Sequence, residues 1–172
     1  MYDWEKLYNE GKIINGLDGF HGSYRCLSNF YPMDIKLSIK INDNIYFSSK
    51  YPEILYQALK CKNKEDIYKF EGLTCGQAKR LGRKIKIRED WEEVKDSIME
   101  EILNEKLNAY KEFKKALKNI PKDMYIVEMN DWNDKYWGVC NKTFQGQNKL
   151  GFLLMKLRDK LQKNWGEHYY GL

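Results

Sequence analysis

The chain has 172 residues, of which 42% are hydrophobic, and this is enough for one core but too little for two cores of ordinary size. No apolar run approaches the length of a membrane span, and the N-terminus lacks the basic-then-apolar order of a secretory signal. We therefore expect one soluble, cytoplasmic domain over residues 1–172. The net charge of +5 favours anionic partners without specifying one.

The first predicted elements are a β-hairpin and a helix. Apolar and polar residues alternate over 35–41, and "NDN" gives a turn signal before the short run "IYF". The stretch "SSKYPEILYQALKCK" then predicts a helix over 52–62. Ser48 or Ser49 stands near its cap, and Pro52 occupies the first turn, where a missing N–H costs little.

The second half of the chain predicts two longer helices and one short strand. Apolar residues recur at helical spacing over 91–117, with acids early and lysines late, and Pro121 ends this helix. "MYIVE" at 124–128 is prone to form a strand, and leucines mark a last amphipathic helix over 150–161. The predicted fold class is α+β, a single helix-dominated domain with a small antiparallel sheet.

The cysteines and histidines do not predict a metal site. Four cysteines lie far apart without a CxxC pair, and the two histidines lie near opposite ends of the chain, whereas structural zinc needs about four clustered ligands. We expect reduced, mostly buried thiols and no metal. The basic run "AKRLGRKIKIR" has two interpretations, a solvated face or a contact with phosphate or nucleic acid.

Two stretches carry polar groups where a simple core is not expected. On the predicted helix, Glu53, Gln57 and Lys60 fall within roughly 60° of one another, opposite the apolar side. This seam is either an ordinary solvated face or a functional one. "VEMNDWNDKYWGVC" at 127–140 threads carboxylates and asparagines among two tryptophans and a tyrosine, which suits a surface that holds a flat, polar ligand better than a core.

Six separated motifs occur in a fixed order along the chain: "LSNFYP", "PEILYQALK", "AKRLGR", "REDW", "VEMNDWNDKYWGV" and "GQNKLGFLLMKLR". This order resembles the NADAR family of YbiA-like N-glycosidases, named for an association with NAD and ADP-ribose. The resemblance covers about residues 20–162, and the tail at 163–172 is unassigned. The family commonly has Glu-His-Ala-Phe-Gln at 53–57, so Ile54 replaces its histidine here.

The resemblance implies hydrolysis of an N-glycosidic bond between ribose and a base or amine. The transition state has oxocarbenium character, which needs a carboxylate near the anomeric carbon and a way to activate water. We expect Glu53 and Asp134 to be the two catalytic acids. Lys60 has two open roles, because it either pairs with Glu53 or forms a Schiff base with the opened ribose.

The expected binding residues follow from their donor types and ring systems. Trp91, Trp132 and Trp137 are candidates for stacking on a base, although Trp91 is equally suited to the core. Phe30 suits packing as well as stacking. The polar contacts expected with ribose, phosphate or base come from Arg25, Asn29, Gln57, Lys79, Arg83 and Asn148. No cofactor is implied.

Three functions remain open at this point. The first is removal of ADP-ribose from modified guanine in DNA, as members of this family do when they counter a DNA-modifying toxin. The second keeps the chemistry but acts on phosphorylated ribosylamino-pyrimidine intermediates of riboflavin synthesis, as metabolite repair. The third is a module that binds ADP-ribose without turnover, which the loss of the histidine at Ile54 motivates and the retention of Glu53 and Asp134 opposes. The oligomeric state is not predicted.

Overall fold

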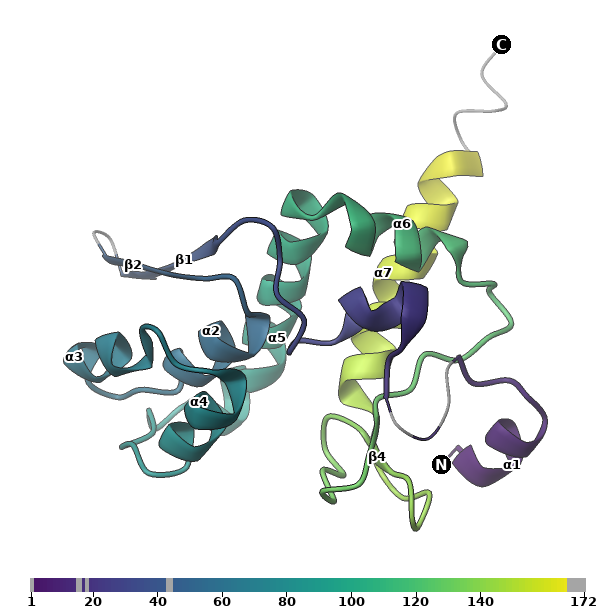
Figure 1. Cartoon of the computed structure of the whole chain (residues 1–172), viewed down its shortest axis with the longest axis horizontal. Helices are drawn as coiled ribbons and strands as arrows, with labels where there is room; N and C mark the ends of the chain where they lie inside the picture. Colours follow the sequence, from purple (N-terminus) through teal and green to yellow (C-terminus); the bar gives the residue numbers. More distant parts are fainter. Residues whose placement is uncertain (1, 15–16, 18, 43–44, 167–172) are drawn as a thin grey trace. The chain divides into compact units, whose positions relative to one another are not determined.

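The structure is a computed structural model that describes residues 2–14, 17, 19–42 and 45–166. Its contacts divide the chain into two compact units (Figure 1). Unit 1 comprises Met1–Ser28 and Glu112–Leu172, and unit 2 comprises Asn29–Lys111. Each unit is described by itself below, and the expectation of a single domain stays a prediction.

Unit 2 begins with the predicted hairpin. Strands β1 (Leu37–Asn42) and β2 (Ile45–Ser49) pair antiparallel, with Leu37 opposite Ser49. Side chains alternate between faces of the strands, so that Leu37, Ile39 and Phe47 are buried. The predicted turn at 43–44 lies outside the described residues.

The central helix of unit 2 is α2 (Pro52–Ala58), and all seven of its residues are buried. Its N-cap is Tyr51, while the Ser49 hydroxyl accepts a hydrogen bond from the Tyr51 N–H. The helix ends four residues before the predicted boundary, because the chain leaves it to pair with residues 86–88. The Lys62 N–H donates to the Lys86 carbonyl, and the Arg88 N–H donates to the Lys60 carbonyl.

Three further helical segments surround α2. Helix α3 (Lys64–Ile67) continues into the 3-10 turn η2 (Tyr68–Phe70), and α4 (Cys75–Gly82) begins with a capping box between Thr74 and Gln77. Helix α2 packs against β2, α4 and α5 (Trp91–Ala109), and Figure 1 shows it between the hairpin and α4. A fully enclosed helix places its polar residues inside the unit.

The predicted helix over 91–117 is two helices. Helix α5 ends at Ala109, and α6 (Lys111–Asn119) follows after one extended residue, Tyr110, with φ −121° and ψ 101°. Tyr110 is buried and stacks on Tyr31, with 6.5 Å between ring centroids. Neither glycine nor proline marks this break in the sequence, and it lies where unit 2 ends and unit 1 resumes.

Unit 1 contains the remaining elements. These are α1 (Trp4–Asn9), the 3-10 helix η1 (Gly22–Leu27), α6, the two short strands β3 (Met129–Asn130) and β4 (Val139–Cys140), and α7 (Lys149–Gly166). Strands β3 and β4 pair in parallel. Over the residues described in both units, no helix is long and apolar enough to cross a membrane.

The predicted strand at 124–128 forms no regular ladder, but its backbone is paired near both ends. The Tyr125 N–H donates to the Lys12 carbonyl, and the Glu128 carbonyl accepts from the Val139 N–H. Only Tyr125 forms a bridge, with Ile13. The Asn148 amide donates to the Ile126 carbonyl at 2.9 Å and accepts from the Glu128 N–H at 3.1 Å, as a neighbouring strand would. The Asn148 side chain thus adds hydrogen bonds between the two ends of this segment that bond to other backbone.

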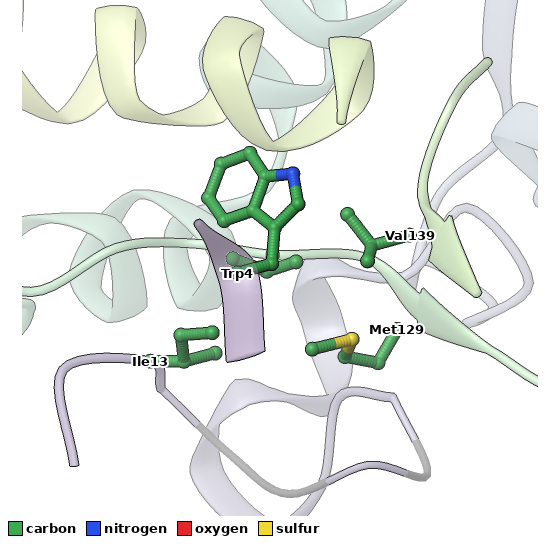
Figure 2. Close-up of a cluster of buried hydrophobic side chains, with 5 residues drawn as sticks. Trp4, Ile13, Met129 and Val139 are labelled. Atoms are coloured by element: carbon green, nitrogen blue, oxygen red, sulfur yellow. The ribbon is translucent and has the colours of Figure 1, made fainter. Parts of the chain in front are cut away.

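A buried cluster holds the N-terminal segment against β3 and β4 (Figure 2). It consists of Trp4, Ile13, Val127, Met129 and Val139, all below 9% exposed. The Trp4 indole N–H also donates to the Gly146 carbonyl at 3.0 Å. Residues near the N-terminus therefore fix both ends of the aromatic, acidic stretch that the sequence singled out.

Candidate functional site

The seam predicted on α2 exists, and it is buried. The Gln57 amide donates to Glu53 Oε1 at 2.7 Å, the contact expected for residues four apart on a helix. Glu53 is 6% exposed and Gln57 is 5% exposed, so the interpretation as a solvated face is wrong. A carboxylate this deep needs a compensating partner, and the Gln57 amide is one.

Gly82 on α4 lies directly against Gln57, and sequence reasoning missed it. A Cβ atom at Gly82 would stand 2.1 Å from Gln57 Oε1 and 3.1 Å from its amide carbon. The close approach of α4 therefore confines the Gln57 amide in the orientation that serves Glu53. The glycine within "AKRLGR" is the only signal for this contact, and spacing alone does not reveal its neighbour.

We expect Gly82→Ala to lower the free energy of unfolding by about 1–3 kcal/mol, because the new methyl group must displace Gln57 or move α4. The matched control is Gly76→Ala on the same helix, where a Cβ would meet only the Arg80 guanidinium at 3.7 Å. This control should be neutral or slightly stabilising. Chemical denaturation of both variants measures the difference, and equal stability of the two would contradict the contact.

Lys60 lies between two aromatic rings. Its Nζ is 5.6 Å from the centroids of both the Tyr56 and the Trp91 rings, which are 5.0 Å apart. Burial lowers the pKa of Lys60, with Glu53 opposing the shift and Lys79 and Arg83 adding to it. Among the described residues, no carboxylate lies within ion-pair distance of Nζ. Direct pairing with Glu53 is therefore not observed, and Glu53 acts on Lys60 at longer range.

Trp91 and Tyr56 together make the wall that desolvates Lys60. Trp91 is 6% exposed at the start of α5, so most of its ring packs inside unit 2. Tyr56, four residues before Lys60, was not among the predicted site residues. Its position one helical turn away is a signal that could have identified it.

The other predicted residues of unit 2 border the same helix. The Asn29 carbonyl accepts from the Glu53 N–H at 3.1 Å, and Asn29 Oδ1 is buried without a hydrogen-bond partner. Phe30 is 43% exposed, and Lys79 Nζ stands 5.0 Å from its ring centroid. Arg83, the C-cap of α4, is exposed. Unit 2 thus gathers an acid, two amides, three cations and exposed or partly buried rings.

Asp134 in unit 1 holds a turn. Its Oδ1 accepts the backbone N–H groups of Tyr136 at 3.1 Å and Trp137 at 2.9 Å. The Asn130 side chain in turn accepts from the Asp134 N–H and donates to its carbonyl. One carboxylate oxygen is therefore engaged in shaping the loop, and the role of Asp134 as a second catalytic acid stays a prediction.

The two tryptophans of this loop differ in exposure. Trp132 is 60% exposed, whereas Trp137 is half-buried and meets Tyr136 edge to face, with 5.1 Å between centroids. Lys149 Nζ lies 5.6 Å from the Tyr136 ring. Arg25, at the end of η1, is exposed. Trp132 therefore presents the most exposed large ring among the side chains described in unit 1, as stacking on a base requires.

Asn148 has a structural role. It is fully buried, both polar atoms of its amide bond to the backbone of residues 126 and 128, and its φ is 51°. A Cβ atom at Gly151 would stand 2.4 Å from the same amide. Because the amide is fully enclosed and both of its polar atoms already bond to the backbone, the site proposed below excludes Asn148.

The predicted site residues divide between the two units. Unit 2 carries Asn29, Phe30, Glu53, Gln57, Lys60, Lys79, Arg83 and Trp91, and unit 1 carries Arg25, Trp132, Asp134, Trp137 and Asn148. The first set includes one buried carboxylate, that of Glu53. Within the part of the chain that the structure describes, no group of histidine, cysteine and acidic residues could hold a metal ion. All four cysteines are free and buried, as predicted.

Comparison with known proteins gives one consistent result. The NADAR domain model matches residues 19–162. The N-glycosidase YbiA of Shigella flexneri is 29% identical over 123 residues, which cover 72% of this chain and 75% of that protein. The N-glycosidase YbiA of Escherichia coli K12 is 37% identical over 86 residues, 49% of this chain and 52% of that protein.

The fold agrees with these matches. The NMR structure of the E. coli protein YbiA matches with a TM-score of 0.66 at 26% identity, covering 93% of this chain and 94% of that one. This confirms the predicted fold class, helix-rich with a small antiparallel sheet. The match to 19–162 also agrees within one residue at its start with the range that the six motifs indicated.

Proposed function

The chain belongs to the NADAR family, and we propose that it is an N-glycosidase that hydrolyses the bond between a ribose carbon and a base, with ADP-ribosylated guanine in DNA as its substrate. The observation that supports this best is the buried Glu53–Gln57 pair beside a lysine with a lowered pKa. Perturbed titratable groups that cluster in this way are typical of reaction centres.

Glu53 supplies the charge that this reaction needs. As the bond from the ribose carbon to the base nitrogen breaks, its electron pair leaves with the base, and positive charge develops on the sugar. A carboxylate in a site with little water stabilises that charge far better than one in bulk solvent. The hydrogen bond from Gln57 holds Oε1 in place.

Lys60 acts as a nucleophile in this proposal. Its lowered pKa increases the share of neutral amine, and the neutral amine is the form that attacks carbon. The amine bonds to the ribose carbon as the bond to the base breaks, and the base leaves with the electron pair and takes up a proton. The bond from the same carbon to the ring oxygen then breaks, a proton passes from the amine nitrogen to that oxygen, and the opened sugar is held as an imine. Water hydrolyses the imine, which releases the sugar as an aldehyde and restores the amine. Lys60 makes no ion pair within the described part of the chain, which favours this role over charge pairing.

Phosphate-rich DNA fits the charges near this centre. Lys79 and Arg83 both act on the pKa of Lys60, and both belong to the basic run of α4 and the residues after it. Cationic side chains along one segment contact a phosphate backbone without reading its sequence. The alternative substrates are the riboflavin intermediates, and the alternative function is binding of ADP-ribose without turnover.

The experiment that tests the function compares substrates directly. The full chain is incubated with a guanine-ADP-ribosylated oligonucleotide and, separately, with phosphorylated ribosylamino-pyrimidines, and products are followed by mass spectrometry. We expect cleavage of the oligonucleotide at a rate at least about tenfold above that of the pyrimidines. Faster cleavage of the pyrimidines would replace the proposed substrate. Cleavage of neither, with ADP-ribose still bound, would support a binding module.

A further inference from the structure

Unit 2 contains a cavity of about 890 Å³ beside α2. Its wall is formed by β2, by residues 70–73 after η2, by the first turn of α4, and by Phe30, Lys36 and Ile54. Cavities of roughly 300–1,000 Å³ accept ligands of nucleotide or drug size. The cavity is therefore large enough for a substantial part of a substrate, and nothing in the proposed chemistry at Glu53 and Lys60 uses it.

The chemistry of the wall is cationic and aromatic. Lys36 and Lys50 line the cavity, and within the described residues neither forms an ion pair, while Glu71 is the one acidic side chain of the lining. Phe30 offers a ring that is 43% exposed. The Ser49 hydroxyl, buried in the wall, accepts from the Tyr51 N–H and keeps its own proton to donate.

Two residues of the cavity wall lie on or beside the helix that carries Glu53. Ile54, the residue after Glu53, lines the wall where the family commonly carries histidine, so this part of the wall is apolar. Cys75 also lines it, and burial raises the pKa of the Cys75 thiol to about 12, with the charge of Glu53 as the second cause. Ile54 on α2 and Cys75 at the start of α4 thus connect the cavity wall to the two helices that pack together around Glu53 and Gln57.

We propose that this cavity binds a mononucleotide group of the substrate, with its flat base on Phe30 and its phosphate at Lys36 and Lys50. The inference rests on the proposed function, and it deepens that function by assigning the part of the substrate remote from the broken bond. A ring and a phosphate together match the adenylate end of an ADP-ribosyl group. A ribosylamino-pyrimidine with one phosphate has no second base to place there.

The test measures binding of AMP to the full chain by calorimetry, with ribose 5-phosphate as the comparison ligand. We expect AMP to bind at least about tenfold more tightly, because only AMP carries a base that stacks. Lys36→Glu, Lys50→Glu and Phe30→Ala should each weaken AMP binding roughly tenfold. The matched control is Lys64→Glu, an exposed lysine on α3 outside the cavity, and it should leave AMP binding unchanged.

Two results would overturn the subsite. One is AMP binding that is absent or equally affected by Lys50→Glu and Lys64→Glu. The other is a loss of affinity for unmodified DNA in Lys36→Glu and Lys50→Glu with AMP affinity intact, which would assign these lysines to the DNA backbone.

The subsite and the proposed function can fail separately. Turnover of the ADP-ribosylated oligonucleotide without AMP binding would overturn the subsite alone. AMP binding with the expected losses, but no cleavage of any substrate, would support the subsite and overturn the glycosidase.

Discussion

Glu53→Gln is expected to lower kcat at least about 100-fold on the ADP-ribosylated oligonucleotide. The substitution removes the negative charge that the developing cation on ribose needs, while the new amide oxygen still accepts the hydrogen bond from Gln57. The fold and the ligand contacts should therefore persist. Single-turnover kinetics, with thermal unfolding of the same sample, measure the loss of rate against any loss of stability.

Ligand affinity separates catalysis from binding in this variant. We expect the dissociation constant for ADP-ribose to change by less than about threefold. The glutamine at position 53 is neutral, so it adds no repulsion toward the ligand's phosphates. The matched control is Glu93→Gln, an exposed acid in the first turn of α5 of the same unit. Turnover of Glu53→Gln equal to that of this control would remove Glu53 from the mechanism.

Lys60→Arg is the second variant with a large expected effect, a loss of turnover of about 100-fold or more. Arginine keeps the positive charge between Tyr56 and Trp91, but it stays protonated and cannot form an imine. A role in charge pairing alone would tolerate arginine far better. Borohydride added during turnover should trap a sugar adduct on Lys60 in the native chain and none in the variant. If borohydride traps no adduct in either protein, the role of Lys60 as the nucleophile is contradicted.

The pH dependence follows from the same lysine. Burial holds the pKa of Lys60 below its ordinary value, so the neutral amine forms at a lower pH than in an exposed lysine. The rate of adduct formation should rise with pH through this lowered pKa and level off above it. Borohydride trapping at a series of pH values measures this rate, and a rate that does not change with pH would contradict the role of Lys60.

Much of unit 2 could be predicted from the sequence, because its signals are local. The alternating residues of β1 and the proline in the first turn of α2 each determine their own element. The pairing of Glu53 with Gln57 also follows from helical spacing. Burial of that pair does not, because it depends on α4 and α5 closing over α2, which no local pattern encodes.

The errors share one physical cause, since each depends on a partner distant in sequence. The long helix breaks at Tyr110, where a buried tyrosine packs on Tyr31. The predicted strand at 124–128 forms no regular ladder, and its hydrogen bonds go to Lys12, Val139 and the side chain of Asn148. Gly82 matters because of Gln57, 25 positions earlier in the sequence numbering. Single-sequence patterns predict propensity, and these contacts override it.

We propose that this chain breaks the bond between ADP-ribose and guanine through Glu53 and Lys60. The most direct measurement is the mass of both products from a guanine-ADP-ribosylated oligonucleotide, with native chain and with Glu53→Gln. We predict that the native chain restores the unmodified oligonucleotide and releases ADP-ribose in equal amount, and that the variant does so at least about 100-fold more slowly. An abasic oligonucleotide, an unchanged substrate, or equal rates for the two proteins would contradict it.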